Sequence, residues 1–223
     1  MNGAKIFNTV CAALLTLAML FIPATSLAKV VEEHIYIIPA GKVDKNVLVK
    51  LKDRIRGSMP MTVRVAVDPA QEIPQAAFDA SRRQYGAQAI LDDIAGRLRL
   101  MKNERALIVA DVDMYAGDLN FVFGLADAGK QVAIISLTRL RNEFYGLKPD
   151  GRAFTDRVVK EAAHELGHSW NLPHCPNTRC VMYFSNSLQD TDRKRDVFCY
   201  KCQIALDHRH GGTTLLGRVM EKK

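Results

Sequence analysis

The chain has 223 residues, of which 48% are hydrophobic and 25% are charged, so its length and composition allow one sizeable buried core. This composition excludes an intrinsically disordered chain. The formal net charge of +7 bears on solubility and on loose attraction to acidic surfaces, and it does not identify a fold.

The first 28 residues differ from the rest and have the pattern of a secretory signal peptide. Lys5 is their only charged residue, residues 10–22 are almost wholly apolar, and Ser26-Leu27-Ala28 is a small-x-small cleavage pattern. An uncleaved membrane anchor is the alternative, but an apolar stretch of 13 residues falls short of the roughly 20 that cross a bilayer. We therefore predict cleavage after Ala28 and an exported protein, either periplasmic or secreted.

Strand-like and helix-like segments then alternate along the chain. Short apolar runs that stop near Pro39 or Asp68 have the form of buried strands, and longer segments with apolar residues at helical spacing have the form of helices. We expect strands at residues 34–38 and 62–67, and helices at residues 47–55 and 82–100.

The same alternation continues toward the middle of the chain. It predicts strands at 106–112, 119–123 and 132–137, then a surface loop over 142–156 and a helix over 156–170. The predicted fold class is therefore α/β, with a mixed, mostly parallel twisted sheet, packed helices and a short antiparallel strand at one edge.

The last predicted helix carries a His-Glu-x-x-His motif at residues 164–168, a pattern typical of zinc sites. Residues four apart lie about 40° apart around a helix and about 6 Å apart along it, so His164 and His168 can bind one ion. Glu165 leaves the helix at another angle, where it can act as general base toward a water activated by the metal. The motif thus predicts hydrolysis of peptide bonds, with Glu165 as the catalytic base.

A catalytic zinc usually has three protein ligands, and His174 is the candidate for the third. On a continued helix His174 would point about 240° away from His168. Asn171 tolerates a left-handed conformation and Pro173 disfavours helix at Leu172, so we expect a sharp turn that returns His174 to the metal. The alternative is that one of these histidines is an ordinary surface or core residue, which the third histidine and the helix stop make the weaker interpretation.

This region resembles the archaemetzincin family. The resemblance rests on His-Glu-Leu-Gly-His-Ser-Trp-Asn-Leu-Pro-His over 164–174 and on the cysteine- and methionine-containing segment over 175–202, and it extends over most of the chain after residue 28. It implies a metzincin-like zincin fold, and it implies that Met182 lies in a turn that supports the metal without binding it. One departure is Asn171, where the family motif usually has Gly.

The resemblance further implies a second, structural zinc. Its ligands would be the four cysteines that remain once Cys11 is removed with the signal peptide: Cys175, Cys180, Cys199 and Cys202. Export to an oxidising compartment favours two disulfides instead, whereas the Cys-x₂-Cys and Cys-x₄-Cys spacings suit a tetrahedral zinc. We predict two zinc ions, one catalytic and one structural.

We expect residues 29–223 to form one archaemetzincin-like metallopeptidase domain. Its upper lobe would cover about residues 29–171, and a small Cys-rich lower lobe would cover about residues 172–223. The expected partner is a peptide or protein substrate, with no nucleic acid and no stable membrane insertion after signal cleavage. The alternative function is a catalytically inactive, zinc-stabilised binding module, but such a module has no need for Glu165 beside its first ligand.

Four other residues could have functional roles, but a structural or surface role is the simpler interpretation of each. Tyr183 could donate a hydrogen bond near the metal but is predicted to be pocket wall, and Trp170 is predicted to serve packing. Asp111 and Asp113, at the end of a predicted strand, are predicted to be surface or capping residues and not cation ligands.

Overall fold

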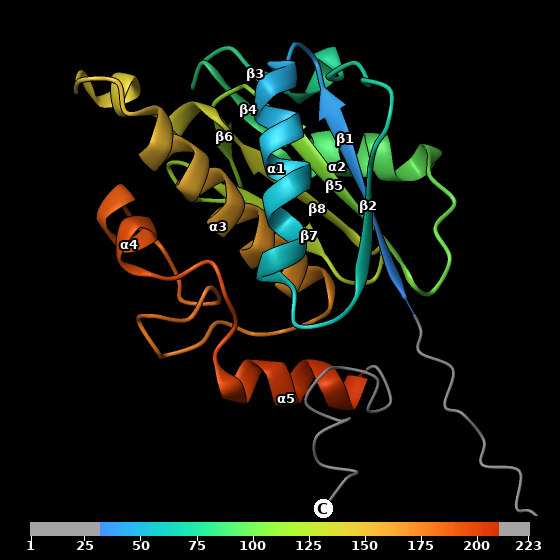
Figure 1. Cartoon of the computed structure of the whole chain (residues 1–223). Coiled ribbons are helices and arrows are strands. Elements are labelled where there is room, and N and C mark those ends of the chain that lie inside the picture. The colour runs from blue at the N-terminus through green and yellow to red at the C-terminus, as the bar shows by residue number, and fades with distance from the viewer. Residues whose placement is uncertain (1–31, 210–223) are drawn as a thin grey trace, which may run out of the picture.

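The protein, seen in a computed structural model that describes residues 32–209, is built on a five-stranded sheet (Figure 1). The strands are β1 (Glu33–Ala40), β2 (Val63–Val67), β5 (Glu104–Ala110), β7 (Gly124–Asp127) and β8 (Val132–Ser136). Their spatial order is β2-β1-β5-β8-β7. Neighbouring strands are parallel except β7, which runs antiparallel to β8 at the edge. The predicted α/β class and antiparallel edge strand are confirmed.

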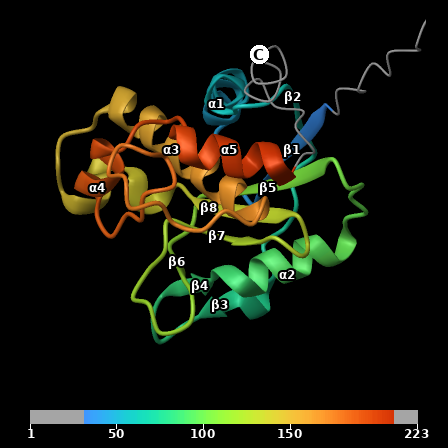
Figure 2. The same cartoon turned by 90° about the horizontal axis from the view of Figure 1, so that it is seen from below.

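Helices cover both faces of this sheet. Helices α1 (Lys45–Ser58) and α3 (Gly151–Ser169) lie on one face, and α2 (Ala87–Arg97) lies on the other (Figure 2). Successive strand residues point to opposite faces, so Ile37 belongs to the core on the α1 and α3 side while Ile38 belongs to the core on the α2 side. The parallel strands are buried on both faces, which explains their nearly continuous apolar sequences.

A smaller sheet and several short helices complete the upper part of the molecule. The small sheet consists of β3 (Phe78–Asp79), β4 (Gln84–Gly86) and β6 (Met114–Tyr115). The 3₁₀ helices are η1 (Gln75–Ala77), η2 (Thr138–Leu140) and η3 (Asn142–Tyr145).

The segment after α3 contains two helices, α4 (Leu188–Arg193) and α5 (Tyr200–Arg209), and lies on the same side of the sheet as α1 and α3 (Figure 2). Its buried residues Met182, Phe198 and Leu206 belong to the same apolar cluster as the α1 and α3 face of the sheet. The C-terminal segment therefore shares the core of the molecule, and does not depend on a separate one.

Three predicted elements differ from the structure. The helix predicted at 82–100 begins only at Ala87, because Arg83 has a left-handed backbone (φ 54°) and residues 84–86 pair with β3 and β6 as β4. The strand predicted at 119–123 is displaced, since the edge strand β7 begins at Gly124. Helix α3 also begins earlier than predicted, at Gly151, inside the expected loop.

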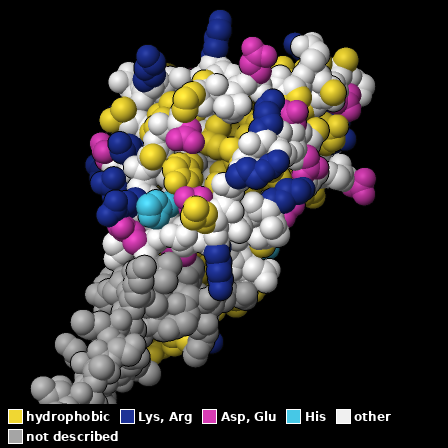
Figure 3. Space-filling model, turned by 90° about the vertical axis from the view of Figure 1, so that its right-hand side faces the viewer, with side chains coloured by type: hydrophobic (Ala, Val, Ile, Leu, Met, Phe, Trp, Pro, Cys, Tyr) yellow, Lys and Arg dark blue, Asp and Glu magenta, His cyan; other side chains and the backbone are white. Residues whose placement is uncertain are grey.

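In the part of the chain that the structure describes, no helix is both long enough and apolar enough to span a bilayer. On the face seen in Figure 3, Lys and Arg side chains lie among Asp, Glu and apolar side chains. That face therefore carries mixed charge.

Candidate metal centre

Helix α3 places the motif histidines at its C-terminal end. The helix begins after Asp150, whose side chain accepts hydrogen bonds from the backbone N–H groups of Arg152 and Ala153. Its apolar side, which includes Val159 and Leu166, is fully buried against the sheet. This packing fixes the rotation of the helix, so His164 and Glu165 are turned inward, with 4% and 5% of their surfaces exposed.

A tight turn follows α3 and returns the chain toward the motif. Asn171 has φ 62°, in the left-handed region that asparagine tolerates better than most residues. The backbone N–H of Leu172 donates to the carbonyl oxygen of Gly167 at 3.0 Å, which closes the turn. His174 then lies beside the other two histidines, with ring centroids 5.3 Å from His164 and 4.7 Å from His168.

The three imidazoles converge on one point. One nitrogen from each of His164, His168 and His174 lies within 4.8 Å of the others. The Nε2 atoms of His164 and His168 are 3.1 Å apart. Two ligands at a tetrahedral zinc with bonds of about 2.0–2.1 Å lie about 3.3 Å apart, so this spacing suits a shared zinc ion.

Hydrogen bonds fix the tautomers of the two helical histidines. Nδ1 of His164 lies 2.8 Å from the carbonyl oxygen of Val181, and Nδ1 of His168 lies 2.7 Å from the carbonyl oxygen of Leu172. A carbonyl oxygen only accepts, so each Nδ1 carries a proton and donates it. In the neutral rings both Nε2 atoms then have lone pairs that face each other, an arrangement that a bound cation stabilises.

The electrostatics favour these neutral rings. Burial lowers the pKa of His164 well below its ordinary value, with the positive charge of Lys194 adding to the effect. Burial likewise lowers the pKa values of His168 and His174. Neutral imidazole is the form that ligates a metal, so the donor set, its tautomers and its protonation all fit a zinc ion.

Glu165 lies next to this donor set without belonging to it. Burial raises its pKa well above the ordinary value, and the nearby carboxylate of Glu161 adds to that rise while Lys194 opposes it. A dication beside Glu165 would favour the charged carboxylate. Gly124 permits this position, because a Cβ built there would lie 2.5 Å from Cγ and 2.6 Å from Oε1 of Glu165.

Met182 packs beneath the motif. It is fully buried, and a Cβ built on Gly167 would collide with its sulfur and lie 3.0 Å from Cε1 of Phe198. The adjacent Val181 supplies the carbonyl that orients His164. Met182 therefore fills the space that a glycine leaves open one residue before His168.

The four cysteines form a second candidate metal centre. Their sulfur atoms all lie within 4.8 Å of one another, and the pairs Cys175–Cys199 and Cys180–Cys202 are each 3.7 Å apart. Sulfur atoms at a tetrahedral zinc with bonds near 2.3 Å lie about 3.8 Å apart, so the cluster fits a structural zinc. Burial acts to raise the pKa of Cys199, but hydrogen bonds from the Cys202 backbone and the neighbouring thiols outweigh it and lower the pKa to about 7.

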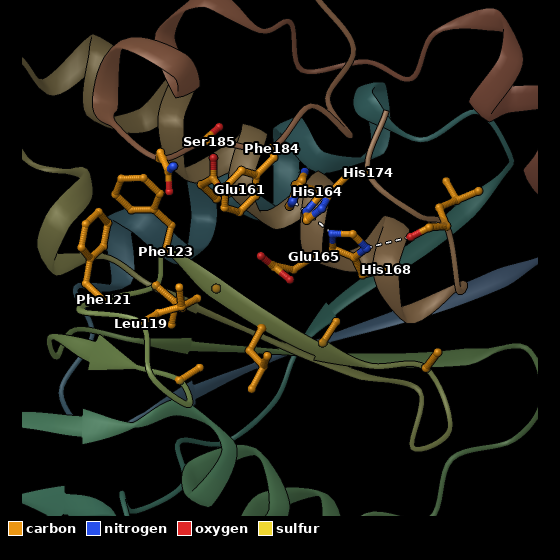
Figure 4. A pocket seen from close by; sticks show the side chains of 18 of the residues that line it. Leu119, Phe121, Phe123, Glu161, His164, Glu165, His168, His174, Phe184 and Ser185 are labelled. Atoms are coloured by element: carbon orange, nitrogen blue, oxygen red, sulfur yellow. Dashed lines mark hydrogen bonds between the residues drawn. The ribbon is translucent and has the colours of Figure 1, made fainter. Parts of the chain in front are cut away.

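A cleft of about 400 Å³ lies between β7 and the histidines (Figure 4). Gly124, Leu125 and Ala126 of β7 form one wall, and the three histidines with Glu165 form another. Because β7 is the last strand in the sheet order, one of its edges is directed away from β8. The cleft thus combines a metal-ligand set with a strand edge.

The remaining candidates lie outside this cleft. Trp170 is 4% exposed and packs in the core, and Tyr183 does not line the cleft. Asp111 accepts two hydrogen bonds from Arg141, and Asp113 accepts two from Arg139, so both aspartates are engaged in ion pairs.

The structure also reveals residues near the centre that the sequence did not single out. They are Gly124, Gly167, Glu161, Lys194 and Ser185. For Glu161 there was one available signal, since it precedes Glu165 by one helical turn and so shares a helix face with it.

Comparison with known proteins gives consistent similarities. Residues 21–208 match the sequence profile of peptidase family M54. An archaemetzincin of Pyrococcus abyssi is 44% identical over 176 residues, which cover 78% of this chain and 94% of the relative. The crystal structure of a zinc-dependent peptidase from Methanocorpusculum labreanum superposes with a TM-score of 0.69 at 34% identity, covering 77% of this chain and 99% of that one. The archaemetzincin of Methanopyrus kandleri gives 0.69 at 32% identity, with 82% and 98% covered.

Proposed function

The chain belongs to peptidase family M54, the archaemetzincin family, and is a zinc metallopeptidase; from that premise we propose that His164, His168 and His174 hold its catalytic zinc and that Glu165 is the general base. The observation that carries the proposal is the convergence of three imidazoles, with one nitrogen from each within 4.8 Å of the others, beside the buried carboxyl group of Glu165. A zinc ion at this place supplies Lewis-acid chemistry, polarising a peptide carbonyl and lowering the pKa of water to about 7.

Different residues orient the histidines and transfer the proton during hydrolysis. The Val181 and Leu172 carbonyls hold the His164 and His168 rings, so that their Nε2 atoms face one point. A carboxylate oxygen of Glu165 accepts a proton from the attacking water and then passes it to the amine nitrogen that leaves. The Gly124 backbone lies against Glu165 and confines the carboxylate on the cleft side.

The substrate is a peptide or protein segment. Strand β7 borders the cleft and is an edge strand, so its backbone N–H and C=O groups can pair with an extended chain. Such pairing would lay the substrate backbone along β7, within reach of Glu165.

The experiment is a peptide-library cleavage assay on the zinc-loaded chain, on the chelator-treated chain and on Glu165→Gln. We expect cleavage to disappear with the chelator and to return with zinc. Glutamine keeps the shape of glutamate but cannot accept the proton of the water, so Glu165→Gln should keep its zinc and fold and lose nearly all hydrolysis. Substantial activity in a zinc-loaded Glu165→Gln sample would contradict the assignment of the base.

The alternative is an inactive binding module held together by zinc. The buried Glu165 argues against it, because a structural site needs its ligands and has no use for a carboxylate whose charged form is costly to bury. Absence of cleavage of any peptide by the fully zinc-loaded protein would favour the module.

Export and the division into lobes are part of the proposal. The signal peptide, residues 1–28, lies outside the described residues, and its sequence pattern is its support. N-terminal sequencing of the protein from a periplasmic or culture-medium fraction should give Lys29 as the first residue. We also propose an upper lobe (about 29–171) and a lower lobe (about 172–223), and the turn of the chain after α3 supports this boundary.

A further inference from the structure

The cleft has unlike ends on the two sides of the histidines (Figure 4). On one side lie Phe121, Phe123 and Phe184 (Figure 4). The lining also includes Leu172, whose carbonyl oxygen lies 2.7 Å from Nδ1 of His168. The aromatic end therefore offers flat, apolar walls that suit a ring-bearing side chain.

The aromatic walls are held in place. Phe121 and Phe123 pack edge to face with ring centroids 5.2 Å apart. The guanidinium of Arg139 lies 4.4 Å from the centroid of Phe121 and is itself fixed by two hydrogen bonds to Asp113. Phe184 packs against the His174 ring at 4.9 Å. This end of the cleft is therefore preorganised before a substrate arrives.

Polar groups lie at the same aromatic end. Ser185 lines the cleft there, and its hydroxyl oxygen is buried with no hydrogen-bond partner among the described residues. Burying a hydroxyl without a hydrogen-bond partner costs free energy, so a ligand that accepts from or donates to this hydroxyl would recover that cost.

Glu161 supplies a hydrogen-bond acceptor in the same cleft. It lines the cleft, is 2% exposed, and accepts hydrogen bonds from Lys194 Nζ at 3.0 Å and Thr191 Oγ1 at 3.1 Å. Both bonds use Oε1, which leaves the lone pairs of Oε2 for another donor. Lys194 is fully buried and cancels the charge of Glu161, so the pair presents an acceptor without a net negative charge.

We propose that the aromatic end of the cleft selects a tyrosine side chain next to the scissile bond, with Glu161 and Ser185 recognising the phenol hydroxyl. The inference rests on the proposed peptidase function. The phenol O–H would donate to Glu161 Oε2, and its oxygen would accept from Ser185 Oγ. Phenylalanine would pack against the same aromatic side chains but would make no hydrogen bond to Ser185 Oγ or to Glu161 Oε2. A site built to bond a hydroxyl discriminates strongly against an analogue that lacks it. A lysine or arginine side chain would add a second positive charge near Lys194.

The test compares peptides that differ at one position flanking the cleaved bond. Series with Tyr, Phe, Leu and Arg, placed in turn on each side of the bond, are offered to the zinc-loaded enzyme, and mass spectrometry locates each cut. On one side of the bond we expect kcat/KM for Tyr to exceed that for Phe by at least about 10-fold. Equal values for Tyr and Phe on both sides, or a preference for Arg, would overturn the proposal.

Variants separate recognition from structure. Ser185→Ala should lower the Tyr/Phe ratio of kcat/KM by at least about fivefold, and Ser185→Thr should restore it because threonine keeps the hydroxyl. The control is Ser81→Ala. Ser81 is exposed, does not line the cleft, and donates a hydrogen bond to Asp79, so its substitution should leave the Tyr/Phe ratio of kcat/KM unchanged. A merely structural role for Ser185 would lower turnover of both peptides and keep their ratio, which would count against the proposal.

A binding measurement makes the inference testable apart from catalysis. Calorimetry with uncleaved Tyr and Phe peptides on zinc-loaded Glu165→Gln should give at least about fivefold tighter binding for Tyr. If the enzyme cleaves peptides and neither assay favours Tyr, the selectivity proposal fails alone. If no peptide is cleaved but Tyr peptides bind more tightly, the peptidase proposal fails and the pocket assignment stands.

Discussion

Two glycines shape the site through the side chains that they lack. Gly124 leaves room for Glu165, and Gly167 leaves room for Met182. Neither needs a left-handed backbone, since both lie in regular elements, β7 and α3. Their role is steric, so each substitution should act through the one side chain that it displaces.

Gly124→Ala should remove most hydrolysis while keeping zinc and fold. The new Cβ would overlap the carboxylate end of Glu165, a flexible group that must then move from its place beside the three histidines. A displacement of about 1 Å at a catalytic group lowers rates by about 100-fold. Turnover and zinc content are measured on the same sample.

The matched control is Gly96→Ala, since nothing lies within 4 Å of a Cβ at that position of α2. It should leave turnover unchanged and stabilise the helix slightly, because alanine is the better helix former. If Gly124→Ala behaves like Gly96→Ala, the close approach to Glu165 has no catalytic consequence.

His174 and Met182 should differ sharply when substituted. His174→Ala removes one of the three proposed ligands and should weaken zinc binding by at least about 100-fold. Loss of a residue that only hydrogen-bonds a metal ligand already costs about 10–100-fold in metal affinity. Met182→Leu nearly conserves volume and should weaken zinc binding by less than about 10-fold. Competition with a chelator measures the zinc affinity of both variants. Equal losses of affinity would contradict the proposal that His174 binds the zinc and Met182 only supports the site.

At the scale of elements, two ion pairs join α3 to α4 and the residue after it, one buried and one with a half-exposed aspartate. Lys194, which follows α4, pairs with Glu161 of α3 at 3.0 Å with side-chain exposures of 0% and 3%. Arg157 of α3 also donates two hydrogen bonds to Asp192 of α4. These contacts fasten the C-terminal segment to the helix that carries the motif.

Lys194→Met should destabilise the protein by about 3–5 kcal/mol, because it leaves the buried Glu161 carboxylate without its counter-charge. Urea unfolding at fixed zinc concentration measures the change. The double variant Lys194→Met with Glu161→Gln should lose less stability than the single variant, because no buried charge is then left without a counter-charge. Lys130→Met, at an exposed cation that pairs with Asp92 at 2.6 Å, is the control and should have a far smaller effect. A Lys194→Met variant as stable as this control would contradict the argument.

Sequence periodicity predicted those elements whose apolar pattern faces a single core. It located β1, α1, β2, β5 and β8 within a few residues. It failed at 82–86, where pairing with β3 and β6 overrides the helical spacing, and at 119–123, where apolar alternation reflects Phe121 and Phe123 lining a cleft and not a sheet face.

For the candidate site, sequence spacing named the groups that share one helix or one turn. His164, Glu165 and His168 follow from helical geometry, and His174 follows from the stop signals between them. Lys194 and Ser185 could not be found in this way. Their contacts with α3 and the cleft arise only when a distant segment folds back, a consequence of tertiary packing that spacing does not encode.

At the scale of the whole molecule, the four cysteines join the segment after His174 to α5. Cys175 and Cys180 flank an exposed loop, whereas Cys199 and Cys202 lie at the start of α5. The close sulfur pairs are Cys175–Cys199 and Cys180–Cys202, so each connects the two segments across the cluster. A metal there would hold α5 against the turn that supplies the third histidine.

We expect the protein isolated without reduction to contain two zinc ions per chain and to release four thiols when it is denatured in chelator. The spacing of 3.7 Å in both close pairs suits sulfur atoms that share one ion. His174→Ala should lose the catalytic zinc and keep the cysteine-bound one, whereas Cys199→Ser should do the reverse and lower the melting temperature, because structural zinc contributes directly to folding. Metal analysis, thiol titration and intact mass are measured on the same samples. One zinc per chain, no free thiols and a mass lower by four hydrogens would establish two disulfides in their place, and the oxidising compartment would then have decided the chemistry of the cluster.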